Sequence, residues 1–249
     1  MRRTLLIDGD IFLYRAAFAA EETHSFDGEL HMSSASLDNA KSHFDAHIES
    51  LEKRFKSDAT VFALSADGNW RKAIYPEYKA QRKVVRRPIL LKPLREYVEA
   101  TRKCYSRPLL EADDVLGILA TGTVITGKKL VVSIDKDLLQ IPGKHFNPVK
   151  ADAGVITVTE QEGDYAHMMQ TLAGDVVDNY PGCPGVGPKS AAKWLALGDM
   201  TWWQAVVVAY EKKGLTEHDA LVMAQISRIC RACDYDFVAR SVIPWTPDL

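Results

Sequence analysis

The sequence is poor in cysteine, and this scarcity excludes a disulfide-stabilised fold. Four cysteines in 249 residues, Cys104, Cys183, Cys230 and Cys233, are too few and too scattered for a disulfide framework. Cys230 and Cys233 form a C-x-x-C, but no second Cys or His pair stands at zinc-ligand spacing. We therefore expect ordinary reduced cysteines.

Signals for export or membrane insertion are missing as well. The first residues, MRRTLLIDGD, offer only Leu5, Leu6 and Ile7 before an aspartate, far too short a run for a signal peptide or a membrane span. The chain is 47% hydrophobic and 26% charged, as expected of a soluble globular protein with one large domain or two small ones. We expect a cytoplasmic protein with no membrane partner.

An excess of positive charge is also absent, since the net charge is -2, but the charges are distributed unevenly. Between Arg71 and Lys103 basic residues far outnumber acidic ones, and tyrosines lie among them. A basic segment that contains aromatic residues suits a groove that binds phosphates and stacks on bases. The basic residues are Arg71, Lys72, Lys79, Arg82, Lys83, Arg86, Arg87, Lys92, Arg95, Arg102 and Lys103.

Apolar runs and helical patterns alternate along the first two thirds of the chain. Residues 4–7, 60–64 and 130–134 are β-branched, apolar runs that predict buried strands. Helical patterns are predicted over residues 12–20, 35–55, 88–102 and 113–121. This order predicts an α/β fold with a largely parallel sheet and helices on both faces. Residues 155–158 are expected to add an edge strand.

Acidic residues follow each of these three predicted strands. Asp8 follows the first, Asp67 the second, and Asp135 and Asp137 the third. Because the carboxyl ends of parallel strands meet at one edge of a sheet, where ligands bind, we expect these side chains to converge. A single Asp-Gly pair is also a common turn signal, but the repetition after every strand favours a site.

The stretch LLEADDVLGILA, residues 109–120, adds Glu111, Asp113 and Asp114 at the head of an apolar helix. Acids favour the first turn of a helix, so this stretch alone favours capping. Two like charges about 4 Å apart repel by about 1 kcal/mol in water and about 4 kcal/mol at an effective dielectric constant of about 20. Together with the acids after the strands, the stretch therefore favours a bound cation. Asp175 and Asp178, three residues apart, are expected on one helical face.

This acidic set contains no His or Cys. Oxygen ligands select Mg²⁺ or Mn²⁺ over zinc, and a cluster of this size could hold two ions. Two such ions can activate water and stabilise the leaving oxygen of a phosphodiester, which is the chemistry of many nucleases. The predicted metal ligands are Asp8, Asp67, Glu111, Asp113, Asp114, Asp135, Asp137, Asp175 and Asp178.

A loop rich in glycine precedes a predicted helix in PGCPGVGPKSAAKWL, residues 181–195. Glycine lets the backbone approach a phosphate, proline suits the first helical turn, and free N–H groups at a helix start bind anions. Lys189 adds a positive charge. The run is not a P-loop, because G-x-x-x-x-G-K-[ST] is absent. A plain connection between two helices is the alternative.

Together these motifs resemble the flap-endonuclease-like 5′-nucleases, which include bacteriophage 5′-3′ exonucleases and the 5′-nuclease domain of bacterial DNA polymerase I. The resemblance runs through LLIDGD, WRKAIYPEYKAQRK, LLEADDVLG, VVSIDKDLLQ and LAGDVVDNYPGCPGVGPKSAAKWL, over roughly residues 4 to 200. It implies a PIN-like nuclease core over residues 1–165, with a basic arch segment at about 70–105. It also implies a helix-three-turn-helix DNA-binding subdomain over residues 166–249.

The resemblance also assigns roles to individual residues. It implies two Mg²⁺ or Mn²⁺ ions held by the acidic set, directly or through water. Lys79 and Arg82 match the basic pair of the family's helical gateway, with Arg71 as a companion, and would hold the scissile phosphate. Asp10 stands where many members have Asn, so its role as a metal ligand is open. The residues implied in DNA binding are Lys83, Gly185, Gly187, Lys189 and Ser190, with a K⁺ ion at the helix-three-turn-helix.

The first functional hypothesis is a monomeric, Mg²⁺-dependent 5′-3′ exonuclease of duplex DNA, with RNA–DNA hybrids and 5′ flaps as further substrates. Two alternatives in the same class are a structure-specific flap endonuclease acting mainly on branched DNA and a PIN-type ribonuclease. A DNA-binding module without activity is the alternative from another class. A phage enzyme of this kind would work in the host cytoplasm. Beyond residue 200 we expect helices, with Trp202 and Trp203 in their core.

Overall fold

The computed structural model describes residues 2–26, 30–81 and 86–247. Its centre is a sheet with strand order β5-β4-β1-β6-β7-β8, in which only the β7–β8 pair is antiparallel. The prediction of a largely parallel sheet, with residues 155–158 at its edge, is confirmed. The strands are β1 (Arg3–Asp8), β4 (Ala59–Ala63), β5 (Cys104–Tyr105), β6 (Lys128–Val132), β7 (Gly143–Phe146) and β8 (Val155–Val158).

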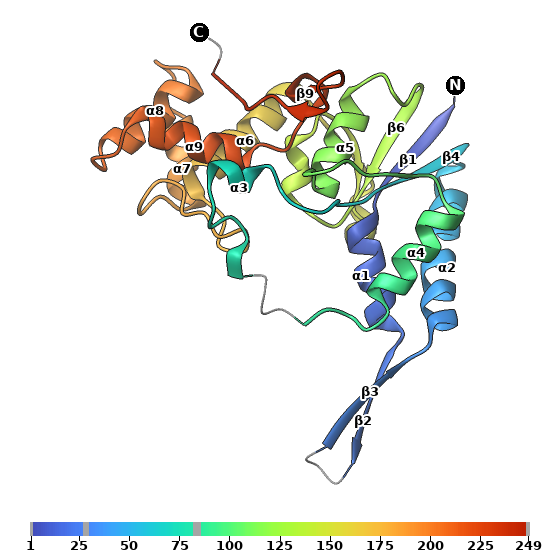
Figure 1. Ribbon diagram of the computed structural model, residues 1–249. Helices are drawn as coiled ribbons and strands as arrows, with labels where there is room; N and C mark the ends of the chain where they lie inside the picture. The colour runs from blue at the N-terminus through green and yellow to red at the C-terminus, as the bar shows by residue number, and fades with distance from the viewer. Residues whose placement is uncertain (1, 27–29, 82–85, 248–249) are drawn as a thin grey trace.

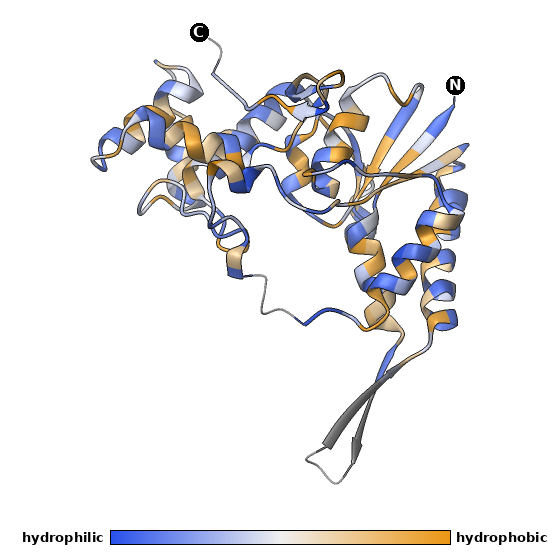
Figure 2. Ribbon diagram, in the orientation of Figure 1, coloured by the Kyte–Doolittle hydropathy of each residue, from blue (hydrophilic) through white to orange (hydrophobic). Residues whose placement is uncertain are grey.

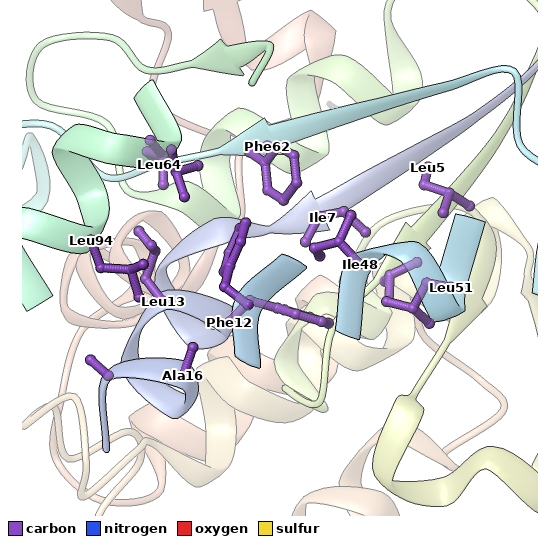
Figure 3. Packing of buried hydrophobic residues seen from close by; sticks show 14 of the residues in the cluster. Leu5, Ile7, Phe12, Leu13, Ala16, Ile48, Leu51, Phe62, Leu64 and Leu94 are labelled. Carbon is purple, nitrogen blue, oxygen red and sulfur yellow. The ribbon is translucent and has the colours of Figure 1, made fainter. Parts of the chain in front are cut away.

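Successive side chains of the central strands enter two different cores. Leu5, Ile7 and Phe62 pack in one core with α1 (Gly9–Ala19), α2 (Leu37–Phe55) and α4 (Leu91–Thr101) (Figure 3). Leu6 and Val61 pack in the other with α5 (Ala112–Thr121). Hydrophobic residues accordingly gather where the helices meet the sheet (Figure 2). This alternation is the period of a β-strand with both faces buried, and it explains why the runs read as continuously apolar.

The carboxyl-terminal third of the chain is helical and lies beside the sheet (Figure 1). Thr159 caps α6 with a capping box, so this helix begins before the predicted boundary at residue 165. The division into two domains stays a prediction. Trp202 and Trp203 pack against the core of these helices, as expected. The helices are α6 (Glu160–Ala173), α7 (Pro188–Leu195), α8 (Trp202–Glu211) and α9 (Glu217–Ser227).

The sequence did not predict the antiparallel hairpin of β2 (Glu21–Phe26) and β3 (Leu30–Ala35), which projects beyond α1 and α2 (Figure 1). The helix predicted over residues 35–55 therefore begins only at Leu37, after its Ser36 cap. The small carboxyl-terminal pair of β9 (Tyr235–Asp236) and β10 (Ser241–Val242) was not predicted either.

Hydrogen bonds and an ion pair hold the basic segment on both sides of residues 82–85. After α3 (Arg71–Ile74), the amide of Lys79 donates to the Asp178 carbonyl at 2.8 Å, which joins this end to the helical third. At the other end, Arg86 pairs with Glu21 at 2.6 Å and accepts a hydrogen bond from the Tyr14 hydroxyl. The segment thus connects the helical third to α1 and the hairpin.

Two expectations about the chain as a whole can be compared with the structure. All four cysteines are free thiols. Across residues 2–26, 30–81 and 86–247, helices with the length and hydropathy needed to span a bilayer are absent.

The position of α5 depends on close packing at Gly117. A Cβ atom added at Gly117 would overlap the carbonyl oxygen of Cys230, on the segment that follows α9. Glycine has the lowest helix propensity of all residues except proline. The close contact with Cys230, rather than helix propensity, therefore explains why position 117 is glycine.

Gly117→Ala is expected to lower the free energy of unfolding by about 1–3 kcal/mol, because the overpacked contact outweighs the gain of about 1 kcal/mol in helix propensity. Chemical denaturation of both proteins measures the difference. Gly198→Ala, where no atom lies within 4 Å of the added Cβ, is the matched control and should change stability little. Stabilisation by Gly117→Ala would contradict the packing described.

Candidate functional site

A cavity of about 460 Å³ opens at the carboxyl edge of the sheet, between the sheet and the helical third. Its wall contains carboxylates from both parts of the molecule. Most of the predicted acids are therefore brought together. The acids that line it are Asp8, Asp10, Glu111, Asp113, Asp135, Asp137, Asp175 and Asp178.

Asp8 ends β1 and caps α1, where its carboxylate accepts from the Ile11 amide at 3.3 Å. It also accepts from the Ser133 hydroxyl at 2.6 Å. The residue is 1% exposed, and this burial raises the pKa of Asp8 from 3.8 to about 7, with smaller contributions from neighbouring carboxylates. A cation beside Asp8 would favour its charged form.

The pKa values of Asp113 and Asp137 are also raised. Burial raises the pKa of Asp113 well above its usual range, and the charge of Asp8 adds to the effect. Burial and the neighbouring Asp135 raise the pKa of Asp137 to about 6. Asp135 follows the end of β6, and its carboxylate accepts a hydrogen bond from the Asp137 amide at 2.9 Å. These carboxylates are crowded without enough positive charge beside them.

Glu111 is in a different environment, because basic and hydroxyl groups surround it. Its carboxylate contacts the Lys79 ammonium at 2.5 Å, the Tyr78 hydroxyl at 3.1 Å and Arg71 at 3.2 Å. Burial disfavours its charge, but Lys79 and Arg71 outweigh burial and lower the pKa of Glu111. Lys79 also contacts Asp178 at 3.3 Å, so its ammonium bridges the two acids. Lys79, predicted to hold the scissile phosphate, lies in the cavity wall.

Asp175 and Asp178 line the cavity. The prediction that they lie on one face of a helix is wrong, because they lie in a turn. Residues 175–180 form a turn closed by backbone hydrogen bonds between Asp175 and Tyr180, at 2.9 and 3.0 Å. Asp175 accepts from the amides of Val177 and Asp178 at 2.6 and 3.1 Å, which fixes the turn. Asp and Asn side chains that bond the backbone two residues on favour turns over helices.

Asp67, predicted as a metal ligand, does not line the cavity. The chain turns away from the sheet after β4, and Asp67 is exposed, with its carbonyl accepting from the Leu109 amide at 3.2 Å. Ser65 lines the cavity where Asp67 was expected. Its amide donates to Asp10 at 3.2 Å, and its hydroxyl accepts from the Ala112 amide at 2.9 Å. Asp10, whose role was left open, thus occupies the wall, and burial raises its pKa.

Asp114, predicted as a metal ligand, lies outside the cavity wall and is buried in the core. It is fully buried, and its two oxygens accept from Arg71 at 2.7 Å each. The Trp70 indole and the Cys230 amide donate at 3.1 Å each. Burial disfavours its charge, but Arg71 prevails and the pKa of Asp114 is lowered.

Arg71, predicted to hold a phosphate, is instead engaged within the protein. Each of its side-chain nitrogens donates to a protein group: to Asp114 and Glu111, and to the carbonyls of Ile226 and Arg228 at 2.8 and 2.6 Å. It is 2% exposed. The arginine therefore joins α3, α5 and the end of α9. Arg82 and Lys83, the other predicted basic residues of this segment, lie outside the described residues.

The predicted DNA-binding residues Gly185, Gly187, Lys189 and Ser190 form an exposed surface apart from the cavity. Gly187 caps α7 and Pro188 occupies its first turn, as the sequence predicts. Gly185 has a φ of +74°, a conformation that side chains rarely adopt. Lys213, which the sequence did not single out, lies next to Gly185.

Several wall residues were missed from the sequence because no motif marks them. Ser65, Gln170 and Ser227 carry no charge, and Lys136 stands between the acids Asp135 and Asp137. The only available signal was proximity to the acids at the strand ends. Tyr78, which donates to Asp178 at 2.9 Å, was noted only as an aromatic residue of the basic segment.

In the part of the chain that the structure describes, no three acidic, His or Cys side chains stand close enough to form a complete metal site. The donor set nevertheless fits a hard divalent cation, because the wall presents carboxylate oxygens without sulfur or imidazole ligands. The raised pKa values of Asp8 and Asp113 indicate a region in which added positive charge would be stabilising.

Comparison with known proteins identifies the family. A family model described as 5′-3′ exonuclease, N-terminal resolvase-like domain, matches residues 3–171. The chain belongs to the 5′-3′ exonuclease family. The exonuclease of Escherichia phage T7 is 30% identical over 98% of this chain and 93% of its own length. DNA polymerase I of Pseudomonas aeruginosa is 32% identical over 75% of this chain, but over only 21% of its own length. The resemblance seen in the sequence is confirmed, and the chain is a nuclease.

Solved structures of two other nucleic-acid-bound proteins share the fold of this chain. The flap endonuclease of bacteriophage T5, in complex with DNA and metal ions, matches with a TM-score of 0.64 at 16% identity, over 91% of this chain and 89% of that one. The catalytic core of Rad2 with a DNA substrate matches with a TM-score of 0.55 at 14% identity, over 91% of this chain and 78% of its own. Both likenesses confirm the fold class.

Asp8→Asn is expected to stabilise the metal-free nuclease at pH 8 by about 2–4 kcal/mol, since each unit of pKa corresponds to about 1.4 kcal/mol. The folded pKa of Asp8 is raised to about 7, so its contribution to stability is complete below the unfolded pKa and is lost as the pH rises through the folded one. The advantage of the variant should open from about pH 4 and level off above about pH 7. Denaturation in chelator across this range measures it, and a difference independent of pH would contradict the assignment.

Asp114→Asn is expected to act in the opposite direction and destabilise the nuclease by about 3–5 kcal/mol, because it leaves the buried Arg71 charge without its partner. The folded pKa of Asp114 is lowered, so its contribution is present above the unfolded pKa of about 4 and is lost as the pH falls through the folded value. The same denaturation series measures both acids. Equal effects of the two substitutions at pH 8 would show that the two carboxylates do not differ as described.

Proposed function

We propose that the chain is a Mg²⁺-dependent 5′-3′ exonuclease that hydrolyses duplex DNA from the 5′ end as a monomer, with RNA–DNA hybrids and 5′ flaps as further substrates. One observation carries the proposal: carboxylates from β1, α5, the end of β6 and the 175–180 turn converge on one cavity that also contains Lys79. The printed descriptions of relatives as exonucleases, and of a structural neighbour in complex with DNA and metal ions, support it.

The acids that line the cavity would hold two divalent ions, with Mg²⁺ or Mn²⁺ as the expected species. Asp8, Asp113 and Asp135 form one part of this set, and Asp137, Asp175 and Asp178 form the other. Such ions lower the pKa of water and stabilise the leaving oxygen of a phosphodiester. Glu111 would join them when Lys79 releases it.

Lys79 would position the phosphate of the bond to be cut. Its ammonium lies in the wall between Glu111 and Asp178, and its backbone has a φ of +55°, held by the hydrogen bond to the Asp178 carbonyl. A strained backbone at such a place indicates a residue whose position is fixed by its surroundings. Once the acids bind cations, the ammonium is free to donate to a phosphate oxygen. Arg82 is proposed to assist it.

A second surface would hold the duplex backbone. The exposed N–H groups at the start of α7, with Lys189, Ser190 and the neighbouring Lys213, suit phosphates of a strand. The carbonyls near Gly185 and Gly187 are proposed to bind K⁺, and Lys83 to contact the strand. These contacts would set position rather than sequence.

A second candidate function is a structure-specific flap endonuclease acting mainly on branched DNA. The observation that favours it is the basic segment, which contacts the helical third before residues 82–85 and contacts α1 and the hairpin after them. A segment in this position would select strands with a free 5′ end.

Asp135→Asn is expected to lower the rate of 5′ hydrolysis by at least about a hundredfold while the fold persists, because one charged oxygen donor is lost from the cavity. The assay incubates 5′-labelled duplex DNA with Mg²⁺ and follows short labelled products. Asp152→Asn, an exposed acid outside the cavity wall, is the control and should keep full activity.

The same assay tests the choice between the two functions. Duplex, 5′-flap, flap with a blocked 5′ end, and RNA–DNA hybrid are compared at equal concentration. Preference for flaps with a free end would favour the endonuclease, and steady release of short products from a blunt duplex favours the exonuclease. If the unmodified protein leaves every substrate intact with Mg²⁺ and with Mn²⁺, the proposed function fails.

A further inference from the structure

Two valines at the rim of the cavity are exposed to an extent that the fold does not require. Val176 is 91% exposed and Val177 is 67% exposed, in the turn between Asp175 and Asp178. Val177 itself lines the cavity. Two adjacent exposed apolar side chains at the mouth of a cavity form a small apolar surface that the hydrophobic core does not use and that a ligand can contact.

The turn that presents these valines is rigidly held. The Asp175 carboxylate accepts from the Val177 amide, and the backbone of Asp175 pairs with that of Tyr180. The side-chain amide of Gln81 donates to the carbonyls of Val176 and Val177 at 2.8 and 3.3 Å. The exposure of the two side chains is therefore a fixed feature of the surface, defined by contacts on both sides of the turn.

The chemistry around the turn restricts what can contact the valines. The polar groups beside the valines already have partners: the Asp175 carboxylate accepts from the Val177 and Asp178 amides, and the Asp178 carboxylate accepts from Tyr78 and contacts Lys79. The face of a nucleobase carries no charge and packs well against aliphatic groups. Of the parts of a nucleotide, the base is thus the one suited to this site.

We infer that Val176 and Val177 form a platform for the base of the nucleotide on the 5′ side of the bond to be cut. The side is set by Gln81, which holds the turn and belongs to the basic segment that would hold the 5′ end of the strand. This inference rests on the proposed function, since it assigns one further contact to the same substrate. The platform fixes the base while the cavity fixes the phosphate, which places the bond by two separate contacts.

The test compares two 5′-phosphorylated duplexes that differ only in their first nucleotide, which is either dT or an abasic tetrahydrofuran analogue. The first cleavage is followed for the unmodified protein and for a double variant, Val176→Ser with Val177→Ser. The unmodified protein should cut the abasic duplex about tenfold less efficiently, as the loss of roughly one aliphatic contact predicts. The double variant should cut the normal duplex about tenfold less efficiently and should discriminate less than about twofold between the two.

Val238→Ser is the matched control, because Val238 is 94% exposed in the turn between β9 and β10 and lies outside the cavity wall. It should retain full activity and the same ratio between the two duplexes as the unmodified protein. Thermal unfolding of the double variant should match that of the unmodified protein, since both changes are at exposed sites.

Two outcomes would overturn the inference while leaving the proposed function intact. One is efficient cleavage of both duplexes by the unmodified protein with no discrimination. The other is a ratio between normal and abasic DNA that is the same in the double variant as in the unmodified protein. Complete absence of cleavage by the unmodified protein would instead overturn the proposed function and this inference with it.

Discussion

The ion pair between Arg71 and Asp114 is the contact on which the rest of the site depends. It is buried on all sides, and the guanidinium also donates to the carbonyls of Ile226 and Arg228 at the end of α9. One side chain therefore joins α3, the head of α5 and the helical third. Because a buried charge without its partner is costly, this arrangement permits little movement of α5 relative to α9. The cavity between the sheet and the helices has its shape for this reason.

The same contact separates acids that the sequence cannot distinguish. Asp113 and Asp114 are adjacent and chemically identical, yet one lines the cavity and the other lies in the core. Successive residues of a helix point about 100° apart, so a single step along α5 changes the side chain's surroundings completely. The sequence predicted that this stretch contributes carboxylates to a site. It could not predict which of them would form the ion pair with Arg71, because that pair joins residues 43 positions apart.

Local patterns predicted the elements well wherever burial on both faces set the sequence. The strands ending at Asp8 and before Asp135 were recognised, and both acids lie in the cavity wall. Asp67 lies outside the cavity wall because three residues, 64–66, separate it from the end of β4, and the direction of a loop depends on tertiary contacts such as that with Leu109. The turn of residues 175–180 was read as helix, since its acids have helical spacing as well. The β2–β3 hairpin lacks the strong apolar alternation by which strands are recognised.

The distribution of charge divides the cavity into two regions with different uses. Near Asp8 and Asp113 burial and mutual repulsion raise the pKa of each carboxyl group, whereas at Glu111 the bases Lys79 and Arg71 lower it. A divalent cation gains most in the first region, because it relieves a repulsion that the fold leaves in place. In the second region the ammonium of Lys79 already supplies the positive charge, and a cation arriving at Glu111 would have to displace it. An ammonium displaced in this way would favour an anionic partner, and a phosphate would provide one. The charge distribution thus favours a cation in the first region and an anion beside Lys79 in the second.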